Sequence, residues 1–267
     1  MAMLFMALSP ISIYYSSEAR CYAFVEILVF LSVYSTVELG REGDRKWTAI
    51  YVATMTAALY SHYWSVFVLL AANLYWLLFV RPFNDRRWYQ WLAAQALVAI
   101  LLLPLLAMLP GQLTAGHGDW IRRPALDAPL KTLFRFTTGW DVLVRTRPMR
   151  AIEILLFGPY LAVLVPGVLY SGDSDLLTSS RRDLVFFSAV PILAGYLFSL
   201  LVKPMYLIGR FDVVVFPLFA LIVGRGFVRV GRVAQAAVLS ALTISAVLYL
   251  TMLIFRAQLQ NTIFKTL

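Results

Sequence analysis

Long apolar runs separated by short basic clusters recur along the whole chain, and they constrain its fold more than any other feature. Hydrophobic residues make up 61% of the 267 positions and charged residues only 14%, which is more apolar surface than a soluble core can bury. The runs lack the apolar and polar alternation of a barrel strand; Ala236 to Phe255, for example, carries no charge. The sequence therefore predicts an all-α, polytopic transmembrane helical bundle.

Run length predicts about eight membrane helices, because crossing the hydrocarbon core takes about 20 residues. The run from Trp47 to Val80 is too long for one crossing, and polar residues near its middle divide it into a helical hairpin. Met1 to Leu8 is too short to span and lacks the features of a signal peptide, so we expect an N-terminal stub. The expected spans are Ala19–Leu39, Trp47–Ser61, His62–Val80, Trp88–Leu109, Ala151–Ser171, Leu184–Val202, Phe211–Val223 and Val233–Phe255.

No soluble module interrupts the apolar runs, so residues 1–267 are expected to form a single transmembrane domain. Residues 111–150 form a long connection that mixes leucine and aromatic side chains with polar ones. This pattern predicts an extracytoplasmic amphipathic loop, whose short helices lie along the membrane interface and are suited to form a lid. Trp120 and Trp140 are better explained as interface anchors than as platforms for sugar rings.

Basic linkers indicate the orientation, because cytoplasmic loops carry an excess of Lys and Arg. Four compact linkers are predicted to face the cytoplasm. Residues 16–20, 61–63, 111–150 and 203–210 then face the opposite side, although residues 111–150 carry seven basic residues, which counts against this orientation. The cytoplasmic linkers are those around Arg41, Arg45 and Lys46, around Arg81, Arg86 and Arg87, around Arg181 and Arg182, and around Arg225, Arg229 and Arg232.

The net charge of +9 is concentrated beside the apolar runs, where anionic lipid headgroups lie. Membrane lipids are therefore the expected partners, and nucleic acid is not. Cys21 is the only cysteine, so the chain cannot form an internal disulfide or a metal site built from several thiolates.

A polar and aromatic cluster, Ser9 to Ala23, lies at the mouth of the first expected span. A structural explanation suffices for it: Ser17 caps the helix, and Glu18 in the first turn complements the helix dipole. On one continuous helix Glu18, Tyr22 and Glu26 share a face, with Glu26 about two turns, or roughly 12 Å, deeper. An intramembrane carboxylate is expected to face a cavity or a partner. A neutral Glu26 hydrogen-bonded to a neighbouring helix is the alternative.

Three segments resemble bacterial GT-C superfamily glycosyltransferases, relatives of the protein O-mannosyltransferases. Ser9 to Ala23 reads Ser-Pro-x-x-x-Tyr-Tyr-Ser-Ser-Glu-Ala-Arg-x-Tyr-Ala, similar to the family segment that often contains Tyr-Ser-Gln-Glu-Ala-Arg; Ser17 stands where Gln is common. Trp47, Tyr51 and residues 59–63 look like the family's second helical hairpin. Residues 206–211 with Pro217 resemble its late Arg-Tyr segment, although Asp212 departs from that pattern.

The resemblance implies a GT-C-like fold that moves a sugar from a polyprenyl-phosphate donor to a glycan, lipid or protein acceptor. The reaction would take place on the outer side of the bacterial inner (plasma) membrane, often with a divalent cation such as Mg or Mn. The implied catalytic residues are Glu18, near the metal or donor phosphate, and His62, on the acceptor side. A carboxylate can hold a hard cation, and Arg offers a planar fork for phosphate. The implied substrate-binding residues are Tyr15, Arg20, Tyr22, Tyr63, Lys203, Tyr206 and Arg210, with Arg210 on the lipid phosphate.

Structural or lipid-contact roles are alternatives to the assignments of His62, Arg210 and Lys203. His62 at a hairpin tip can simply satisfy backbone groups. Arg210 can extend to lipid headgroups, and Lys203 with Arg210 can form an ordinary anionic lipid contact.

The family's usual catalytic Asp lies in a loop after its first membrane helix, and no counterpart precedes Glu18. We therefore expect an N-terminally truncated fragment that is inactive or incomplete as it stands. The alternative function is a non-catalytic membrane subunit or a lipid-linked sugar carrier. In a carrier, Glu18, Glu26, His62 and Arg210 would line a transport path.

Overall fold

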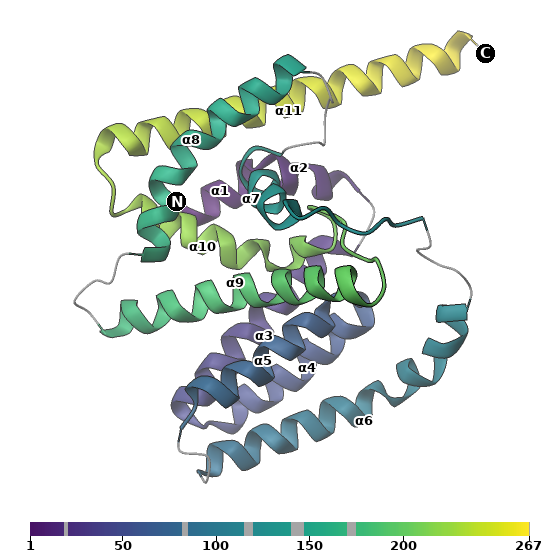
Figure 1. Cartoon of the computed structure of the whole chain (residues 1–267), viewed down its shortest axis with the longest axis vertical. Helices are drawn as coiled ribbons and strands as arrows, with labels where there is room; N and C mark the ends of the chain where they lie inside the picture. The colour runs from purple at the N-terminus through teal and green to yellow at the C-terminus, as the bar shows by residue number, and fades with distance from the viewer. Residues whose placement is uncertain (19–20, 82–84, 115–119, 140–146, 170–174, 267) are drawn as a thin grey trace. The chain divides into compact units, whose positions relative to one another are not determined.

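The structure, a computed structural model, describes residues 1–18, 21–81, 85–114, 120–139, 147–169 and 175–266 (Figure 1). All regular secondary structure in these residues is helical, so the all-α prediction is confirmed. Five helices within the described residues are long and apolar enough to span a membrane, which indicates an integral membrane protein. Their membrane-length segments are Tyr22–Glu42, Arg86–Met108, Ala151–Leu169, Arg181–Leu201 and Arg232–Phe255.

Three of the expected spans correspond to helices that are shorter than a full membrane crossing. α4 (Arg45–Ser61) has 17 residues, α5 (Ser65–Phe79) has 15 and α10 (Phe216–Phe227) has 12. The expected span Phe211–Val223 also starts differently, because a 3-10 helix, η1 (Asp212–Val215), precedes α10. A straight crossing takes about 20 residues, so the count of eight spans stays a prediction.

The chain divides into two compact units, which are described separately below. The first unit comprises Met1–Ala19, Leu130–Asp173 and Ala220–Leu267. The second unit comprises Arg20–Pro129 and Ser174–Phe219. The expected single domain over the whole chain stays a prediction.

The second unit is built around α3 (Tyr22–Glu42), which packs against α4, α5 and η1. α4 also packs against α6 (Arg86–Thr114), and α5 against α9 (Asp175–Leu201). The tight turn after α3 needs a glycine, because Gly43 adopts a φ of +67° there. Asp44 then caps α4 by accepting a hydrogen bond from the backbone N–H of Lys46.

Three basic linkers of the second unit meet at one end of its helices. Arg87 Nη1 donates to the backbone oxygen of Gly40 at 2.6 Å. Asp183 is buried and accepts from Arg41 Nη2 at 3.3 Å and from Arg182 Nη2 at 3.0 Å. The opposite end of α3, at Tyr22, lies about 30 Å away at 1.5 Å per residue. Three of the four linkers that are predicted to share a side of the membrane therefore share an end of this unit.

The first unit contains α1 (Ala2–Leu8), α2 (Pro10–Ser17), most of α7 (Ala128–Thr138), α8 (Arg147–Leu169), the end of α10 and α11 (Arg232–Thr266). α8 packs against α11, and the rings of Phe134 and Phe157 stack with centroids 3.9 Å apart. Gly226 of α10 lies so close to the backbone of Val163 in α8 that a methyl group there would overlap it. α7 is a short helix inside the predicted amphipathic loop. Its position at a membrane interface stays a prediction.

The predicted helix cap at Ser17 is wrong. Ser17 is the last residue of α2, and Glu18 leaves that helix with an extended backbone, φ −86° and ψ 127°. α2 is a separate helix because Pro10, at its first position, suits a helix start and cannot continue α1. Glu18 therefore shares no helix face with Tyr22 and Glu26, both of which are buried in α3.

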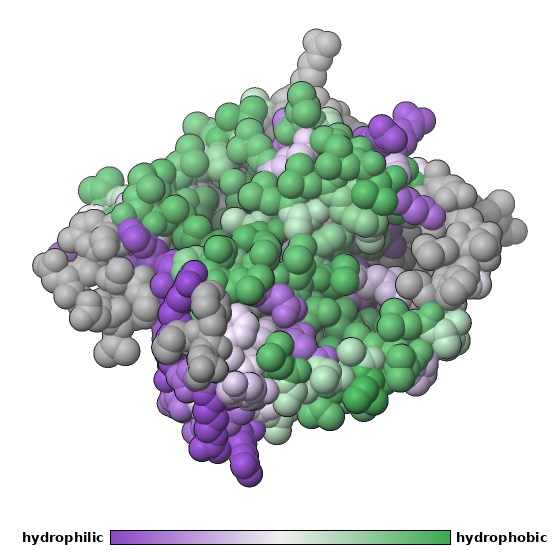
Figure 2. Space-filling model, turned by 60° about the horizontal axis from the view of Figure 1, so that its bottom comes forward, coloured by the Kyte–Doolittle hydropathy of each residue, from purple (hydrophilic) through white to green (hydrophobic). Residues whose placement is uncertain are grey.

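Apolar side chains cover much of the surface that Figure 2 shows. On α6 this pattern includes Leu92, Ile100 and Leu103, which are 57%, 59% and 59% exposed. A soluble helix would turn such residues inward. In a bilayer they face lipid, while all backbone groups of the helix are satisfied internally.

Labelling of Cys21 tests the predicted orientation. Cys21 is exposed, precedes α3 and is the only cysteine of the chain, so a membrane-impermeant maleimide reports one position. We expect the reagent to label Cys21 in intact spheroplasts of a bacterial host. In a Cys21→Ser background, Arg45→Cys at the start of α4 should react only after the membrane is opened. The reverse pattern would contradict the orientation.

Candidate functional site

Three segments of the second unit meet at the end of α3 that lies away from the basic linkers. They are the start of α3, the turn between α4 and α5, and the segment between α9 and η1. The ring of His62 lies 5.6 Å from that of Tyr22 and 5.2 Å from that of Phe211. Arg210 Nε donates to the Tyr22 hydroxyl at 3.1 Å. The turn before Arg210 depends on Gly209, which has a φ of +66°.

His62 is held in one chemical form. The backbone N–H of Trp64 donates to His62 Nδ1 at 3.1 Å, so the proton of the neutral ring lies on Nε2. Burial, and next the positive charge of Arg210, lower the pKa of His62 from 6.5 to about 4. At neutral pH His62 is therefore an uncharged hydrogen-bond donor through Nε2, and it is poorly suited to act as a base.

Arg210 supplies the positive charge of this site. Its partners are uncharged: the Tyr22 hydroxyl, and the Phe211 ring, whose centroid lies 5.7 Å from the guanidinium carbon. No carboxylate among the described residues forms an ion pair with Arg210. A guanidinium that is half-buried and lacks a carboxylate partner can pair with an anion from outside the protein.

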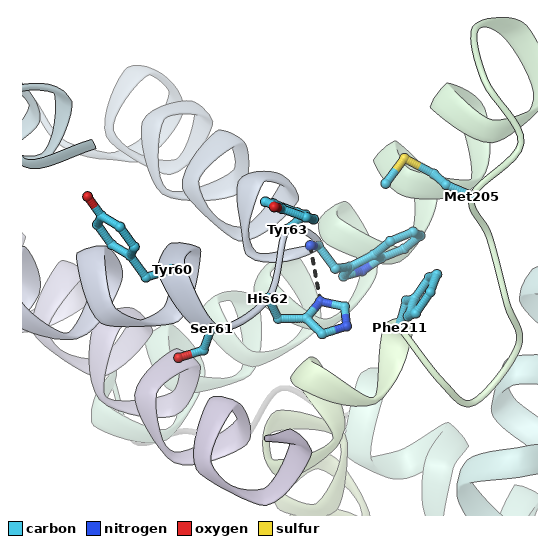
Figure 3. A pocket seen from close by; sticks show the side chains of 7 residues that line it. Tyr60, Ser61, His62, Tyr63, Met205 and Phe211 are labelled. Atoms are coloured by element: carbon cyan, nitrogen blue, oxygen red, sulfur yellow. Dashed lines mark hydrogen bonds between the residues drawn. The ribbon is translucent and has the colours of Figure 1, made fainter. Parts of the chain in front are cut away.

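A cavity of about 290 Å³ opens beside His62 (Figure 3). In Figure 3 the imidazole lies between the turn and Phe211, and the dashed line marks its bond to the backbone of Trp64. Such a mixture of apolar walls and a few polar groups is typical of small-molecule sites. The lining residues are Tyr60, Ser61, His62, Tyr63, Trp64, Met205 and Phe211.

The structure brings together several of the predicted site residues. Tyr22 contacts both His62 and Arg210, and Tyr63 lines the cavity. Tyr206 is buried next to the cavity residue Trp64, with ring centroids 5.5 Å apart. Lys203 is half-buried in the segment that follows α9.

The other predicted site residues belong elsewhere. Tyr15 and Glu18 lie in the first unit, where Glu18 accepts a hydrogen bond from the Tyr14 hydroxyl. Arg20 lies outside the described residues. The roles predicted for these three residues stay predictions.

Sequence reasoning missed Trp64, Met205 and Phe211 as members of the site. A signal was present for Trp64, because aromatic residues surround His62 in the run Tyr60-Ser61-His62-Tyr63-Trp64. Met205 and Phe211 are the sequence neighbours of the predicted site residues Tyr206 and Arg210. Nothing in their spacing indicated that they contact the hairpin turn at His62, which lies about 140 residues earlier. Tertiary contacts of this kind leave no local sequence pattern.

A divalent cation site does not emerge from the side chains in the described ranges. No group of three or more His, Cys, Asp or Glu residues gathers there in a way that could hold a metal ion. The predicted cation stays a prediction, and the chemistry proposed below does not depend on it.

Comparisons of the chain with protein-family models, curated proteins and solved structures found no match.

The pKa of His62 predicts a specific effect of acid on stability. Between about pH 4 and pH 6.5 the unfolded chain binds a proton at this ring and the folded chain does not, so acidification through this window favours unfolding. His62→Asn keeps an acceptor for the Trp64 N–H and removes the titration. Thermal unfolding in detergent should therefore lose less stability between pH 6.5 and pH 4.5 in the variant. Equal losses in both proteins would show that His62 titrates normally.

Proposed function

We propose that the chain is part of an integral membrane glycosyltransferase with a GT-C-like fold, which takes a sugar from a polyprenyl-phosphate donor. The donor phosphate binds between Arg210 and His62. The observation that carries this proposal is that Arg210 and the neutral His62 both contact Tyr22, at the start of a membrane-length helix, and that the charge of Arg210 acts on His62. A lipid phosphate reaches its binding site at such a position, because its tail stays in the bilayer while its charge stays near the interface.

The charge of the site fits one kind of phosphate. Arg210 contributes one positive charge and His62 none, so the pair matches a phosphate with a single negative charge. A sugar joined to a polyprenyl monophosphate is a phosphodiester and carries one negative charge. The guanidinium can pair with two of its oxygens, and the imidazole Nε2–H can donate to one. The aromatic cavity beside His62 is available to the remainder of the ligand.

The same groups can assist sugar transfer. In that reaction an acceptor oxygen bonds to the anomeric carbon, the bond from this carbon to the phosphate oxygen breaks, and its electron pair leaves with the phosphate. Charge builds up on the phosphate, where Arg210 and His62 Nε2–H stabilise it. The acceptor proton passes to a base, which His62 does not supply because its Nδ1 is already occupied. In the family that the chain resembles, this base is an Asp in the loop after the first membrane helix, and no counterpart of it precedes Glu18.

A lipid-linked sugar carrier is the second candidate, and Glu26 favours it. This carboxylate is 8% exposed and lies inside the membrane-spanning α3, one turn beyond Tyr22. An ionisable group at such a depth is expensive to bury and usually marks a transport path or a proton relay. Enzyme and carrier would share the phosphate site and differ in the carboxylate on which they depend.

Replacement of Arg210 tests the phosphate site. Arg210→Gln should weaken the binding of polyprenyl phosphate to the protein in nanodiscs by roughly tenfold to a hundredfold, because a charge-assisted hydrogen bond is worth about 1.5–3 kcal/mol. Arg210→Lys should keep part of the affinity, since it keeps the charge and loses the fork. Arg45→Gln, at the other end of the second unit, is the matched control. Equal affinities of Arg210→Gln and Arg45→Gln for the lipid would refute the site.

Replacement of the two carboxylates separates the candidate functions. In a full-length enzyme, Glu18→Gln should abolish transfer of labelled sugar from its polyprenyl-phosphate donor, with the fold and lipid binding intact. A carrier should instead lose movement of the labelled lipid across vesicle membranes in Glu26→Gln. Circular dichroism and thermal unfolding check the fold of both variants. Retention of transfer by Glu18→Gln would rule out the catalytic role of this carboxylate.

A further inference from the structure

Trp64 contacts both halves of the Arg210–His62 site. Its side chain is 1% exposed, and its ring centroid lies 5.5 Å from that of Tyr206 and 6.1 Å from that of Phe211. These two residues bracket Arg210 in the segment after α9. The backbone N–H of Trp64 is also the donor that fixes the tautomer of His62. The position of one indole ring is therefore linked to both groups that would bind an anion.

The indole ring is seated against Gly195 of α9. A methyl group at residue 195 would overlap Cζ2 and Cη2 of Trp64 and would lie 3.0 Å from its Cε2. Gly195 lies in the interior of a long helix, where alanine is ordinarily the more favourable residue. The ring of Trp64 explains why a residue without a side chain occupies this position. α9 thus supplies a fixed surface on which the ring rests.

We propose that Trp64 is a positioning residue, whose ring, seated on Gly195, holds the His62 turn and the Arg210 segment in register. It acts through His62 and Arg210 and need not touch the ligand. The inference rests on the proposed function only in taking lipid phosphate as the anion. Movement of the ring away from α9 would shift Phe211 and the Trp64 N–H together. Arg210 and His62 would then no longer present their donors to the same phosphate.

Gly195→Ala is the direct test, because the added methyl group displaces the ring and changes no group of the anion site. Gly158→Ala is the matched control, since Gly158 is also inside a helix and has no neighbouring atom within 4 Å of an added methyl group. We expect Gly195→Ala to lower the affinity for polyprenyl phosphate by about tenfold or more, in line with the effect of overpacking a core. The control should bind like the original chain.

The ring itself is tested by a compensating substitution. Phenylalanine lacks the part of the indole that the new methyl group would overlap, so Trp64→Phe should restore binding in the Gly195→Ala background. The double variant should bind more tightly than Gly195→Ala alone, which is the sign of direct coupling between two residues. No gain in the double variant would show that the effect of residue 195 does not pass through the Trp64 ring.

Nitrogen-15 NMR of histidine provides a readout that does not involve the lipid. The chain has only two histidines, and His117→Asn assigns the signal of His62. We expect the His62 signal to show a proton on Nε2 and a pKa near 4 in the original chain. In Gly195→Ala the pKa should move toward 6.5, and the double variant should reverse this shift.

The two readouts separate the inference from the proposed function. Failure of the original chain to bind polyprenyl phosphate would refute the function, and the His62 titration would still test the role of Trp64. An unchanged His62 titration in Gly195→Ala would refute the positioning role even if lipid binding is found. Should Gly195→Ala not fold, Trp64→Phe alone takes its place, because it keeps the backbone N–H and removes the contact with α9. An unchanged titration there would have the same meaning.

Discussion

The hydrogen bond from Arg210 to the Tyr22 hydroxyl joins segments 188 positions apart in sequence, and the proposed site depends on it. It links the start of α3 to the segment that follows α9, next to the turn that carries His62. The partner is neutral, so Arg210 is oriented while its charge stays available. Replacement of the Tyr22 hydroxyl by a carboxylate would orient Arg210 equally well and would cancel the charge that an anionic ligand requires.

Helix ends are where such a site can form in a chain of this composition. Lipid cannot satisfy backbone polar groups, so spanning segments are helical and their polar chemistry gathers where helices begin or end. This constraint explains why the all-α class followed from the apolar runs alone. Tyr22, His62 and Arg210, which the resemblance implied as site residues, each lie at the edge of an apolar run, in agreement with this constraint.

Other features depended on contacts that no local pattern encodes. The sequence around Ser17 and Glu18 is compatible with a capped membrane helix, but Pro10 starts a separate helix and α3 begins only at Tyr22. α4 was expected to span the membrane, yet its 17 residues include three threonines, and it is not among the helices apolar enough to cross. Trp64, in the turn before α5, contacts Gly195 of α9, which lies far from it in sequence. Neither a tryptophan nor a glycine indicates by its residue type that the other is its neighbour, so this contact could not be predicted from the sequence.

The neutral form of His62 decides what the site can contribute. With its proton on Nε2, His62 adds a donor beside Arg210 without adding charge, so the site holds one positive charge throughout the physiological range. The proposed recognition of a phosphodiester rests on that charge, and it would be common to an enzyme and a carrier. What distinguishes the two functions is a group that accepts a proton, and His62 is unsuited to that task. Two carboxylates are proposed to separate the two functions: Glu18, which the resemblance implies for an enzyme, and Glu26 within α3, which favours a carrier.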